Sequence, residues 1–422
     1  MQDVFQFDGK SRSVRAVLLA VVVVVAATAF FAVRWQFGNM LASMTRTVDE
    51  HASEKAKTAI AWSPSDPSAH VLVAATEGGA VARQHLQDAI AIAPNDHRWR
   101  IAYARFLEQD EQFDLAEAEF RQAVALAPSY ARPRWHLGNF LLRRERETEA
   151  LAELKLAAAD DFDFRNQVFS LAWEYFEKDA GKLAEIAGEK PDAVVRLAYF
   201  LASRGRAEAA WETWNRLSGE TREAASAIRQ EIVDGLFLQR HFRVALEFAK
   251  EAGTDRDAAV GAITNGSFEK HLSEDDGGRF GWSVGGGDSK LQAAPDSRVR
   301  HEGERSLRLN FRNFTKPDFS QIVQTIAVEP SGRYRMTFWL RTENLRSAGP
   351  PLVEVLDAEN GGLLVRSRPF AEPNAEWESV TIEFAAPANC DGITIRTNRV
   401  ACGVDCPITG TLWYDDFSLT KL

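Results

Sequence analysis

A short motif of small apolar residues that ends in proline recurs along the first half of the chain. It reads AIAIAP at residues 89–94 and AVALAP at 123–128, a separation of 34 residues, and a related form, KTAIAWSP, occupies 57–64. A fixed period of this length is typical of stacked helical hairpins. Small residues stand where two helices approach closely, and proline follows the second helix because it cannot continue one. The repeat therefore predicts an all-α array over residues 45–257.

Alignment on these prolines brings the apolar positions of successive units into register. One unit is marked by Ala104, Ala116, Phe120, Ala123 and Pro128, and the next by Gly138, Ala150, Leu154 and Ala157. The upstream units contain Ala52, Ala56, Ala59 and Pro64, then Ala82, Leu86, Ala89 and Pro94, and the weaker downstream units contain Ala198, Ala210, Trp214, Leu217 and Ala245.

With this period, residues 45–257 resemble the tetratricopeptide repeat family. Its members bind peptides or partner proteins on a concave surface and are not enzymes as a class, so the resemblance implies a protein partner on the helical-repeat surface. We expect the tryptophans of this region to fill the core between repeats: Trp99, Trp135, Trp173, Trp211 and Trp214.

An uncharged segment precedes the repeats. Ala16–Val33 carries no charge over eighteen residues, which is long enough for a helix to cross a bilayer. Basic residues before it favour a cytoplasmic N-terminus. We therefore predict a short cytoplasmic segment at 1–15, a transmembrane anchor at 16–35 and the bulk of the chain outside the cytoplasm. A cleaved signal peptide is the alternative, because Ala27-Thr28-Ala29 resembles a cleavage site.

The net charge and the cysteines indicate what kind of partner and which redox compartment to expect. The formal net charge of −10, with no cluster of Lys and Arg, argues against nucleic acid as a partner. The cysteines are confined to the C-terminal end, at Cys390, Cys402 and Cys406. Cys402 and Cys406 are candidates for a disulfide, which would fit an oxidising compartment, and small buried thiols are the alternative.

The composition changes after the repeats, where glycine becomes dense and short alternating runs replace helical periodicity. Five runs predict strands: 306–311, 333–342, 378–384, 392–397 and 412–419. Short strands separated by turn-rich segments predict an all-β antiparallel sandwich over residues 260–422.

Several motifs in this region follow one another in a familiar order: ITNGSFE, Gly281-Trp282, EGERSLRL, YRMTFWLR, WESVTIEF and WYDDFSL. In this order they resemble family 4/9-type carbohydrate-binding modules, which are jelly-roll sandwiches that bind glycans and often hold a structural calcium ion. The predicted fold class is thus multidomain, with a single N-terminal transmembrane helix, an all-α tetratricopeptide solenoid and an all-β jelly roll.

Two motifs that could indicate catalysis are better explained without it. GWSVG at 281–285 has the spacing of a nucleophile elbow, but the glycine-rich sequence after Ser283 cannot start a helix, and the one downstream histidine, His301, follows too soon for a hydrolase triad. In EVLDAE, Glu354 and Asp357 are three residues apart, so a strand sends them to opposite faces, and we expect them to be solvated turn carboxylates. We therefore predict that the protein is not an enzyme.

The resemblance implies a calcium site made by Glu269 and an aspartate of YDDFSL. Counting the strand alternation back from Phe417 and Leu419 places Asp415 on the core side and Asp416 opposite. A carboxylate that points inward needs compensation, and a hard cation with oxygen ligands provides it, so Glu269 and Asp415 are the predicted metal ligands. The alternative is that Asp415 accepts backbone N–H bonds at the sheet edge.

A glycan site is predicted on strand 333–342. Its alternation sends one row of apolar side chains to the core and leaves Arg335, Trp339 and Arg341 on the other face. A tryptophan can stack on a sugar ring, and arginines can bind its hydroxyls or carboxylates. Arg396 also faces away from the core of its own strand, and the arginines together favour an anionic polysaccharide. The alternative is that Trp339 is covered by a loop or by the helical array.

Together these features predict a bacterial inner-membrane protein with its bulk in the periplasm. It would recruit a protein through the repeats and bind polysaccharide through the sandwich, as an accessory or scaffold for polysaccharide synthesis, export or envelope assembly. The alternative is a purely protein–protein scaffold in which the sandwich has no sugar ligand.

Overall fold

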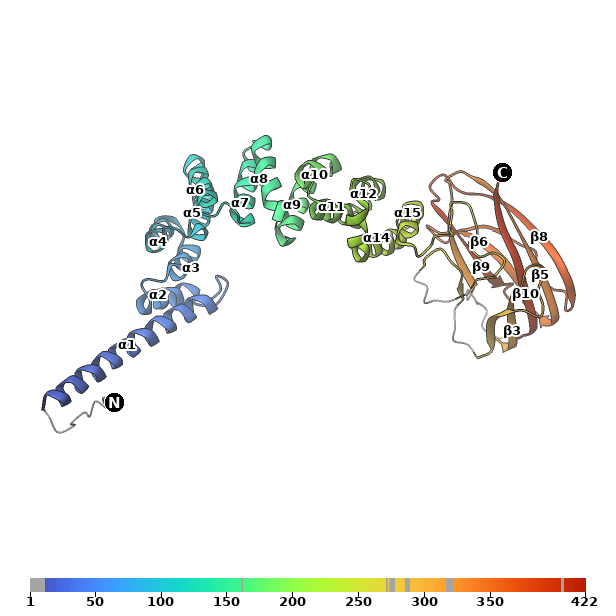
Figure 1. Ribbon diagram of the computed structural model, residues 1–422, viewed down its shortest axis with the longest axis horizontal. Helices are drawn as coiled ribbons and strands as arrows, with labels where there is room; N and C mark the ends of the chain where they lie inside the picture. The colour runs from blue at the N-terminus through green and yellow to red at the C-terminus, as the bar shows by residue number, and fades with distance from the viewer. Residues whose placement is uncertain are drawn as a thin grey trace, which may run out of the picture. The chain divides into compact units, whose positions relative to one another are not determined.

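The structure is a computed structural model that describes residues 12–160, 162–270, 272, 278–284, 289–315, 322–403 and 406–422. Two compact units divide the chain, Met1–Tyr175 and Phe176–Leu422. Helices of the first unit are α1 (Arg12–Met44), α2 (Ala52–Trp62), α3 (Pro67–Glu77), α4 (Gly79–Ile92), α5 (His97–Gln109), α6 (Phe113–Leu126), α7 (Ala131–Arg143), α8 (Glu147–Asp160) and α9 (Phe162–Tyr175). The second unit begins with α10 (Ala180–Ala187), α11 (Pro191–Ser203), α12 (Ala207–Trp214), α13 (Gly219–Ala224), α14 (Ser226–Leu238) and α15 (Phe242–Ala252) (Figure 1).

The helices pair into hairpins, as the repeat predicts: α3 with α4, α5 with α6, α7 with α8, α11 with α12 and α14 with α15. The small residues of the repeat lie at the contacts between paired helices and are fully buried, as at Ala104, Ala116 and Ala150. Gly138 shows why size matters here. A Cβ atom at this position would lie 2.8 Å from Cγ of Leu154, so only glycine allows α7 and α8 to approach this closely.

The segment that follows each early repeat ends one helix and starts the next. Pro64 and Pro94 come two residues after the last residues of α2 and α4, where proline cannot continue a helix. Two residues further on, Asp66 and Asp96 are the N-caps of α3 and α5 and accept hydrogen bonds from the N–H groups of Ser68 and Arg98. The motif Pro-x-Asp therefore sets the boundary between successive hairpins.

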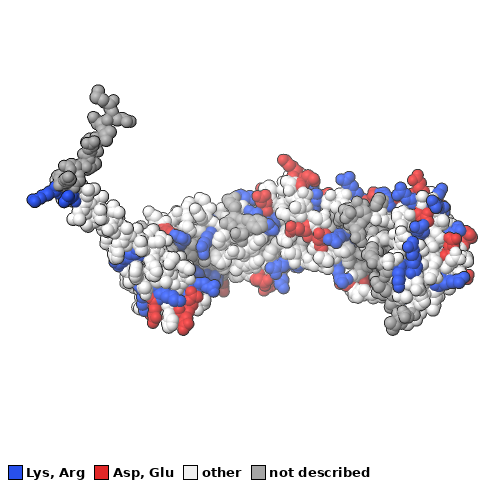
Figure 2. All heavy atoms as spheres, turned by 90° about the horizontal axis from the view of Figure 1, so that it is seen from below, with Lys and Arg blue, Asp and Glu red and all other residues white. Residues whose placement is uncertain are grey.

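Helix α1 is a single helix of 33 residues, about 50 Å long. It is the one described helix long and apolar enough to cross a membrane, by length and composition, and it is compatible with an anchor or with a signal sequence. Figure 2 shows the band without charged side chains along it. The C-terminal part of α1 belongs to the repeat array, since the Arg34 guanidinium donates to the carbonyl groups of Ala61 and Trp62 at the end of α2.

The rest of the second unit is a sandwich of two five-stranded antiparallel sheets, as predicted (Figure 1). Sheet A has the strand order β1-β4-β9-β6-β7, and sheet B has the order β2-β3-β10-β5-β8. The strands are β1 (Ser283–Val284), β2 (Leu291–Asp296), β3 (Ser306–Phe314), β4 (Ile322–Ala327), β5 (Arg333–Ser347), β6 (Pro351–Asp357), β7 (Leu363–Arg366), β8 (Ala375–Ala385), β9 (Gly392–Arg399) and β10 (Ile408–Lys421).

Alternation along the strands builds the core between the sheets. Tyr334, Met336, Phe338 and Leu340 of β5 are buried there, and the residues between them point away, as predicted. Cys402 and Cys406 form a disulfide, which is one of the two alternatives left open for these cysteines. Cys390 keeps a free, buried thiol, and burial and then the neighbouring Asp357 raise its pKa to about 12.

The last helical hairpin, α14–α15, packs on one end of sheet A within the second unit. Phe242 lies against Gly392, where a Cβ atom would come within 2.4 Å of its ring. The main-chain N–H of Arg243 donates to Oδ2 of Asp391 at 3.0 Å, and the Arg240 guanidinium donates to the carbonyl of Ala358. The polypeptide that leaves α15 therefore enters the sandwich beside sheet A.

Candidate functional site

Arg335, Trp339 and Arg341 of β5 share the outer face of sheet B, as the alternation predicted. The two arginines pair with glutamates of β8. Arg335 donates from Nε to Glu383 at 2.8 Å, and Arg341 lies 3.0 Å from Glu376. Both pairs are partly exposed to solvent, so each contributes little to stability.

The ring of Trp339 is covered on one side by a loop of its own domain. His301, in the loop between β2 and β3, stacks on it with ring centroids 3.8 Å apart and an interplanar angle of 17°. The same imidazole meets Trp377 edge-on at 5.8 Å, and its Nδ1 lies 2.8 Å from Oδ2 of Asp416. A sugar ring therefore cannot stack on the side of Trp339 that the imidazole covers. Coverage of Trp339 by a loop is one of the alternatives that the sequence analysis left open.

Asp415 lies beneath the same loop and not in the core. It pairs with Trp339 across β10 and β5, and Tyr414, one residue earlier, pairs with Leu340 in the core. A β-bulge follows Asp415, with Asp416 in a left-handed conformation at φ 49°. The inward orientation predicted for Asp415 is therefore wrong, because the bulge adds a residue to the strand and breaks the alternation counted back from Phe417.

Asp415 and Glu269 hold this loop by accepting main-chain hydrogen bonds. Asp415 accepts from the N–H groups of His301 and Asp416, each at 2.9 Å. Glu269 Oε1 accepts from the N–H groups of Glu304 and Arg305 at 2.8 and 3.1 Å. Burial raises the pKa of Asp415 to about 6, although the hydrogen bond from His301 opposes this shift.

Asp415 and Glu269 are arranged as hydrogen-bond acceptors for the main chain and not as ligands around one cation. In the part of the chain that the structure describes, Glu269 and Asp415 belong to no group of three His, Cys, Asp or Glu side chains with metal-binding geometry. Main-chain N–H groups donate to both carboxylates and so compensate their negative charge, which is the role that the sequence analysis assigned to a cation. A calcium ion at this pair stays a prediction of the sequence, and nothing below depends on it.

Arg396, the fourth residue predicted to bind carbohydrate, lies on the other sheet. It points outward from β9 of sheet A, while the other three belong to β5 of sheet B. The strand alternation places each residue on the outside of its sheet but does not say which sheet its strand joins. The four residues therefore cannot form one site, because the core of the sandwich separates the two faces.

Arg396 belongs to a hydrogen-bonded group on the outer face of sheet A. Its Nε and Nη2 lie 2.9 and 2.8 Å from Oε2 of Glu354 in β6, and the same oxygen accepts from Nδ2 of Asn398 at 2.9 Å. Glu354 is 8% exposed and Asp357 is 2% exposed, so the expectation that both are solvated turn carboxylates is wrong. Strand β6 continues through them, and its neighbour β9 supplies the partners of Glu354.

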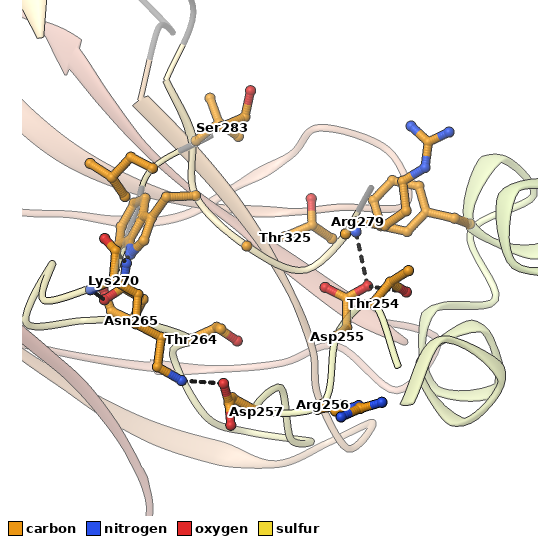
Figure 3. A pocket seen from close by; sticks show the side chains of 16 residues that line it. Thr254, Asp255, Arg256, Asp257, Thr264, Asn265, Lys270, Arg279, Ser283 and Thr325 are labelled. Carbon is orange, nitrogen blue, oxygen red and sulfur yellow. Dashed lines mark hydrogen bonds and ion pairs between the residues drawn. The ribbon is translucent and has the colours of Figure 1, made fainter. Parts of the chain in front are cut away.

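A pocket of about 470 Å³ lies beside this face, at the edge made by β1 and β4 (Figure 3). Thr325 of β4 and Ser283 of β1 line one side, and Lys270 and Arg279 contribute from the segment that enters the sandwich. Figure 3 shows Lys270 turned toward Asp257, with which it forms an ion pair.

Asp255 organises the opposite wall of the pocket. Asp255 is 5% exposed, and its carboxylate accepts hydrogen bonds from the N–H groups of Arg279 and Phe280, each at 3.0 Å. The Arg279 side chain pairs with Asp234 of α14 at 2.8 Å. These bonds fix the backbone at residues 279 and 280 on this side of the cavity.

The pocket and the Arg396 group lie on the same side of sheet A. Val323 lines the pocket and is the cross-strand partner of Arg396, while Thr325, also in the lining, pairs with Thr394 of β9. This face of sheet A therefore carries hydroxyl, amide, carboxylate and guanidinium groups on both sides of the apolar Val323. Of these residues the sequence analysis identified only Arg396, because the others come from segments up to more than a hundred positions away.

A second hollow, of about 640 Å³, lies within the first unit between α5, α7 and α9. Its lining includes Arg105, Arg132 and Trp135. The indole N–H of Trp135 is buried and finds no hydrogen-bond acceptor among the described residues. Burial, followed by the nearby positive charge of Arg105, lowers the pKa of His136 in this hollow to about 4.

The predicted core role of the tryptophans holds for Trp99, Trp173 and Trp214, which are buried. Trp135 is half-buried because it lines the hollow, and Trp211 is half-buried against Phe248. Ser283, the centre of the GWSVG motif, lies in strand β1, and Gly285 lies outside the described residues.

No protein-family model matches this sequence, and no curated protein matches it. Solved structures with local similarity include the CBM22-1–GH10 modules of xylanase 10B from Clostridium thermocellum complexed with xylohexaose (13% identity, 39% of this chain, TM-score 0.26). This chain spans only 29% of that relative. A family 4 carbohydrate-binding module (14% identity, 38% of this chain and 99% of that chain, TM-score 0.27) and the CBM22-1 xylan-binding domain from Paenibacillus barcinonensis (13% identity, 39% and 96%, TM-score 0.25) are also similar. Scores of this size do not establish a common fold, and the sandwich is defined here by its own strand order.

Proposed function

We propose that this protein binds polysaccharide through the outer face of sheet A. The observation that carries the proposal is that the hydrogen-bonded group of Arg396, Glu354 and Asn398 lies on the same face of sheet A as the 470 Å³ pocket, one strand away from its lining residues Val323 and Thr325. Binding sites for small polar ligands combine a preformed cavity with a few fixed donors and acceptors, and a saccharide offers hydroxyls for each of them. The motif order from ITNGSFE to WYDDFSL supports the same ligand class.

The charges in the site narrow the class of glycan. Lys270 pairs with Asp257, Arg279 with Asp234 and Arg396 with Glu354, so each of these cations already has an anionic partner. A cation that is already paired with a carboxylate can still donate hydrogen bonds to sugar hydroxyls, and it does not need a negatively charged group on the ligand. The proposed ligand is therefore a polysaccharide recognised by its hydroxyl pattern, and acidic residues in the polymer are tolerated and not required.

The test uses the full chain in mild detergent against a panel of neutral and acidic polysaccharides in affinity gel electrophoresis. The key variant is Arg396→Ala, and Arg335→Ala is its matched control, because each arginine pairs with a glutamate on a neighbouring strand but on opposite sheets. We expect retardation that Arg396→Ala removes and Arg335→Ala preserves. Loss with Arg335→Ala alone would move the site to sheet B. No retardation in a folded protein would favour the purely protein–protein scaffold.

A second binding function is proposed for the first unit. The hollow between α5, α7 and α9 brings Arg105 and Arg132 close to the indole N–H of Trp135, which has no acceptor among the described residues. An acidic peptide segment of a partner protein supplies carboxylate and carbonyl oxygens, which fits the tetratricopeptide-like repeat pattern. Trp135 fluorescence provides the test. Acidic peptides are expected to change it and basic peptides of equal length are not, with Arg105→Ala reducing the response.

These two activities, with α1 as a membrane anchor, give the role that we propose. The chain is a non-enzymatic, single-pass protein of a bacterial inner membrane, with its N-terminus inside and its bulk in the periplasm. There it holds a polysaccharide and a protein partner together during synthesis, export or envelope assembly. Protease treatment of intact spheroplasts tests the orientation: cleavage of the repeats and sandwich supports it, and protection would overturn it.

A further inference from the structure

Two histidines and an aspartate meet on the facing sides of the α3–α4 hairpin, away from both sites described above. His70 belongs to α3, while His85 and Asp88 are three residues apart on α4 and therefore share one side of that helix. His70 is 8% exposed, and the other two are half-buried. The hairpin itself fixes their approach, because α3 and α4 pack along their length.

The atoms that could bind a metal already stand at the spacing of ligands around one ion. Nδ1 of His70 lies 3.0 Å from Nδ1 of His85 and 3.7 Å from Oδ2 of Asp88, and the three ligand atoms lie within 4.8 Å of one another. In a tetrahedral zinc site with bonds of about 2.1 Å, ligand atoms are roughly 3.4 Å apart. Small side-chain rotations therefore suffice to place all three at bonding distance from a common centre.

The surroundings orient the ligands. Nε2 of Gln84 donates to Oδ1 of Asp88 at 2.9 Å, which leaves Oδ2 directed at His70, as the outer contacts of metal ligands commonly do. The nearby cation, Lys57, is held 2.6 Å from Glu77, which offsets its charge beside the histidines.

We propose that His70, His85 and Asp88 bind a divalent transition metal, for which Zn²⁺ is the probe. Two imidazole nitrogens and one carboxylate oxygen suit such an ion better than Mg²⁺ or Ca²⁺, which prefer oxygen ligands alone. Three protein ligands leave at least one coordination position for water or for an oxygen of a bound partner. The same two nitrogens share the hydrogen bond between the rings, which a bound metal would replace. Bound metal would join α3 to α4 and stiffen this hairpin.

The experiment uses the full chain without a polyhistidine tag, freed of metal with EDTA and exchanged into chelator-free buffer. Zn²⁺ is titrated in competition with a chromophoric chelator, and Co²⁺ is added separately to record its visible absorption. The variants are His85→Gln and Asp88→Asn, both at half-buried positions, so that folding is preserved. His97→Gln is the matched control, since His97 is a half-buried helical histidine outside the cluster. Circular dichroism checks the fold of each variant.

We expect one Zn²⁺ per chain in the wild type and in His97→Gln, at least tenfold weaker binding in His85→Gln, and a weaker effect of Asp88→Asn. Co²⁺ should give the intense visible bands of a site with low coordination number only where His85 is present. A wild type that does not compete with the chelator would overturn the proposal. So would Zn²⁺ binding of unchanged affinity in a folded His85→Gln variant, because the ion would then lie elsewhere.

Discussion

The two outer faces of the sandwich differ in what lies over them. On sheet B, the loop between β2 and β3 covers Trp339 and Asp415, since His301 stacks on the first and donates its main-chain N–H to the second. Asp296, at the end of β2, accepts a hydrogen bond from the indole of Trp413 on the same face. On sheet A, Arg396 and its partners stand beside a pocket of about 470 Å³. Trp339, the aromatic ring that the sequence suggested for stacking on a sugar, is thus partly covered by the protein itself. The better candidate site, on sheet A, has no such aromatic ring.

The largest effect is expected from removing the acceptor at the centre of the sheet A group. Glu354→Ala removes a carboxylate that would accept from a sugar hydroxyl, and it leaves Arg396 and Asn398 without the partner that orients them. Polysaccharide affinity should therefore fall by about 10- to 100-fold in gel-retardation titrations, which corresponds to roughly 1.4–2.7 kcal/mol of binding free energy. Glu383→Ala on sheet B, which frees the exposed Arg335, is the control and should change affinity less than twofold. Equal losses of affinity in both variants would contradict the assignment of the binding site to sheet A.

The next effect concerns the loop that covers sheet B. Asp415→Ala leaves the N–H groups of His301 and Asp416 without their acceptor, which should lower the free energy of unfolding by about 2 kcal/mol in denaturant titrations. Because the pKa of Asp415 is raised to about 6 in the folded protein from 3.8, the folded state binds the proton more tightly than the unfolded state. The stability that this group contributes therefore falls as pH rises from about 4 to 6, by no more than about 1.4 kcal/mol per pH unit.

This pH dependence supplies its own control. The stability difference between wild type and Asp415→Ala should be larger at pH 4 than at pH 7. Asp416→Asn keeps Asp415 in place and suits the left-handed backbone, but it removes a charge that helps to raise the pKa of Asp415, so the same fall in stability with pH should begin at a lower pH. A difference that grows with pH would show that the buried carboxylate is stabilised in its charged form.

A smaller effect is expected from Trp339→Ala, which tests directly whether sheet B takes part in polysaccharide binding. Trp339→Ala removes the ring on which His301 stacks and should lower the melting temperature, since aromatic pairs contribute about 0.5–1.5 kcal/mol beyond area burial. Polysaccharide affinity should change less than twofold, because the covered ring offers no free platform on that side. A tenfold loss of affinity in a folded Trp339→Ala protein would return the binding site to sheet B.

The smallest effect is expected from calcium. The oxygens of Asp415 and Glu269 Oε1 already accept main-chain hydrogen bonds, so millimolar Ca²⁺ should leave the melting temperature of the EDTA-treated protein unchanged. Glu269→Gln serves as the comparison. A rise of several degrees in the wild type that disappears in Glu269→Gln would establish the calcium site that the sequence predicts.

The sequence by itself determined the features that depend on local periodicity. The 34-residue repeat located the close helix contacts, such as the one at Gly138, because small residues recur wherever backbones approach. The uncharged run marked α1, and strict alternation along β5 separated core from surface. Each of these follows from the geometry of one helix or one strand, which a short stretch of chain specifies completely.

Only the tertiary structure decided which of these surfaces lie together. Arg396 and Trp339 both alternate outward, yet β9 and β5 joined different sheets, and pairing between distant strands sets that choice. The bulge in β10 turned Asp415 away from the core, and a loop far away in sequence covered Trp339. Likewise His70 meets His85 and Asp88 only because α3 folds back on α4. Contacts of this kind depend on the packing of separate elements, and no local period encodes them.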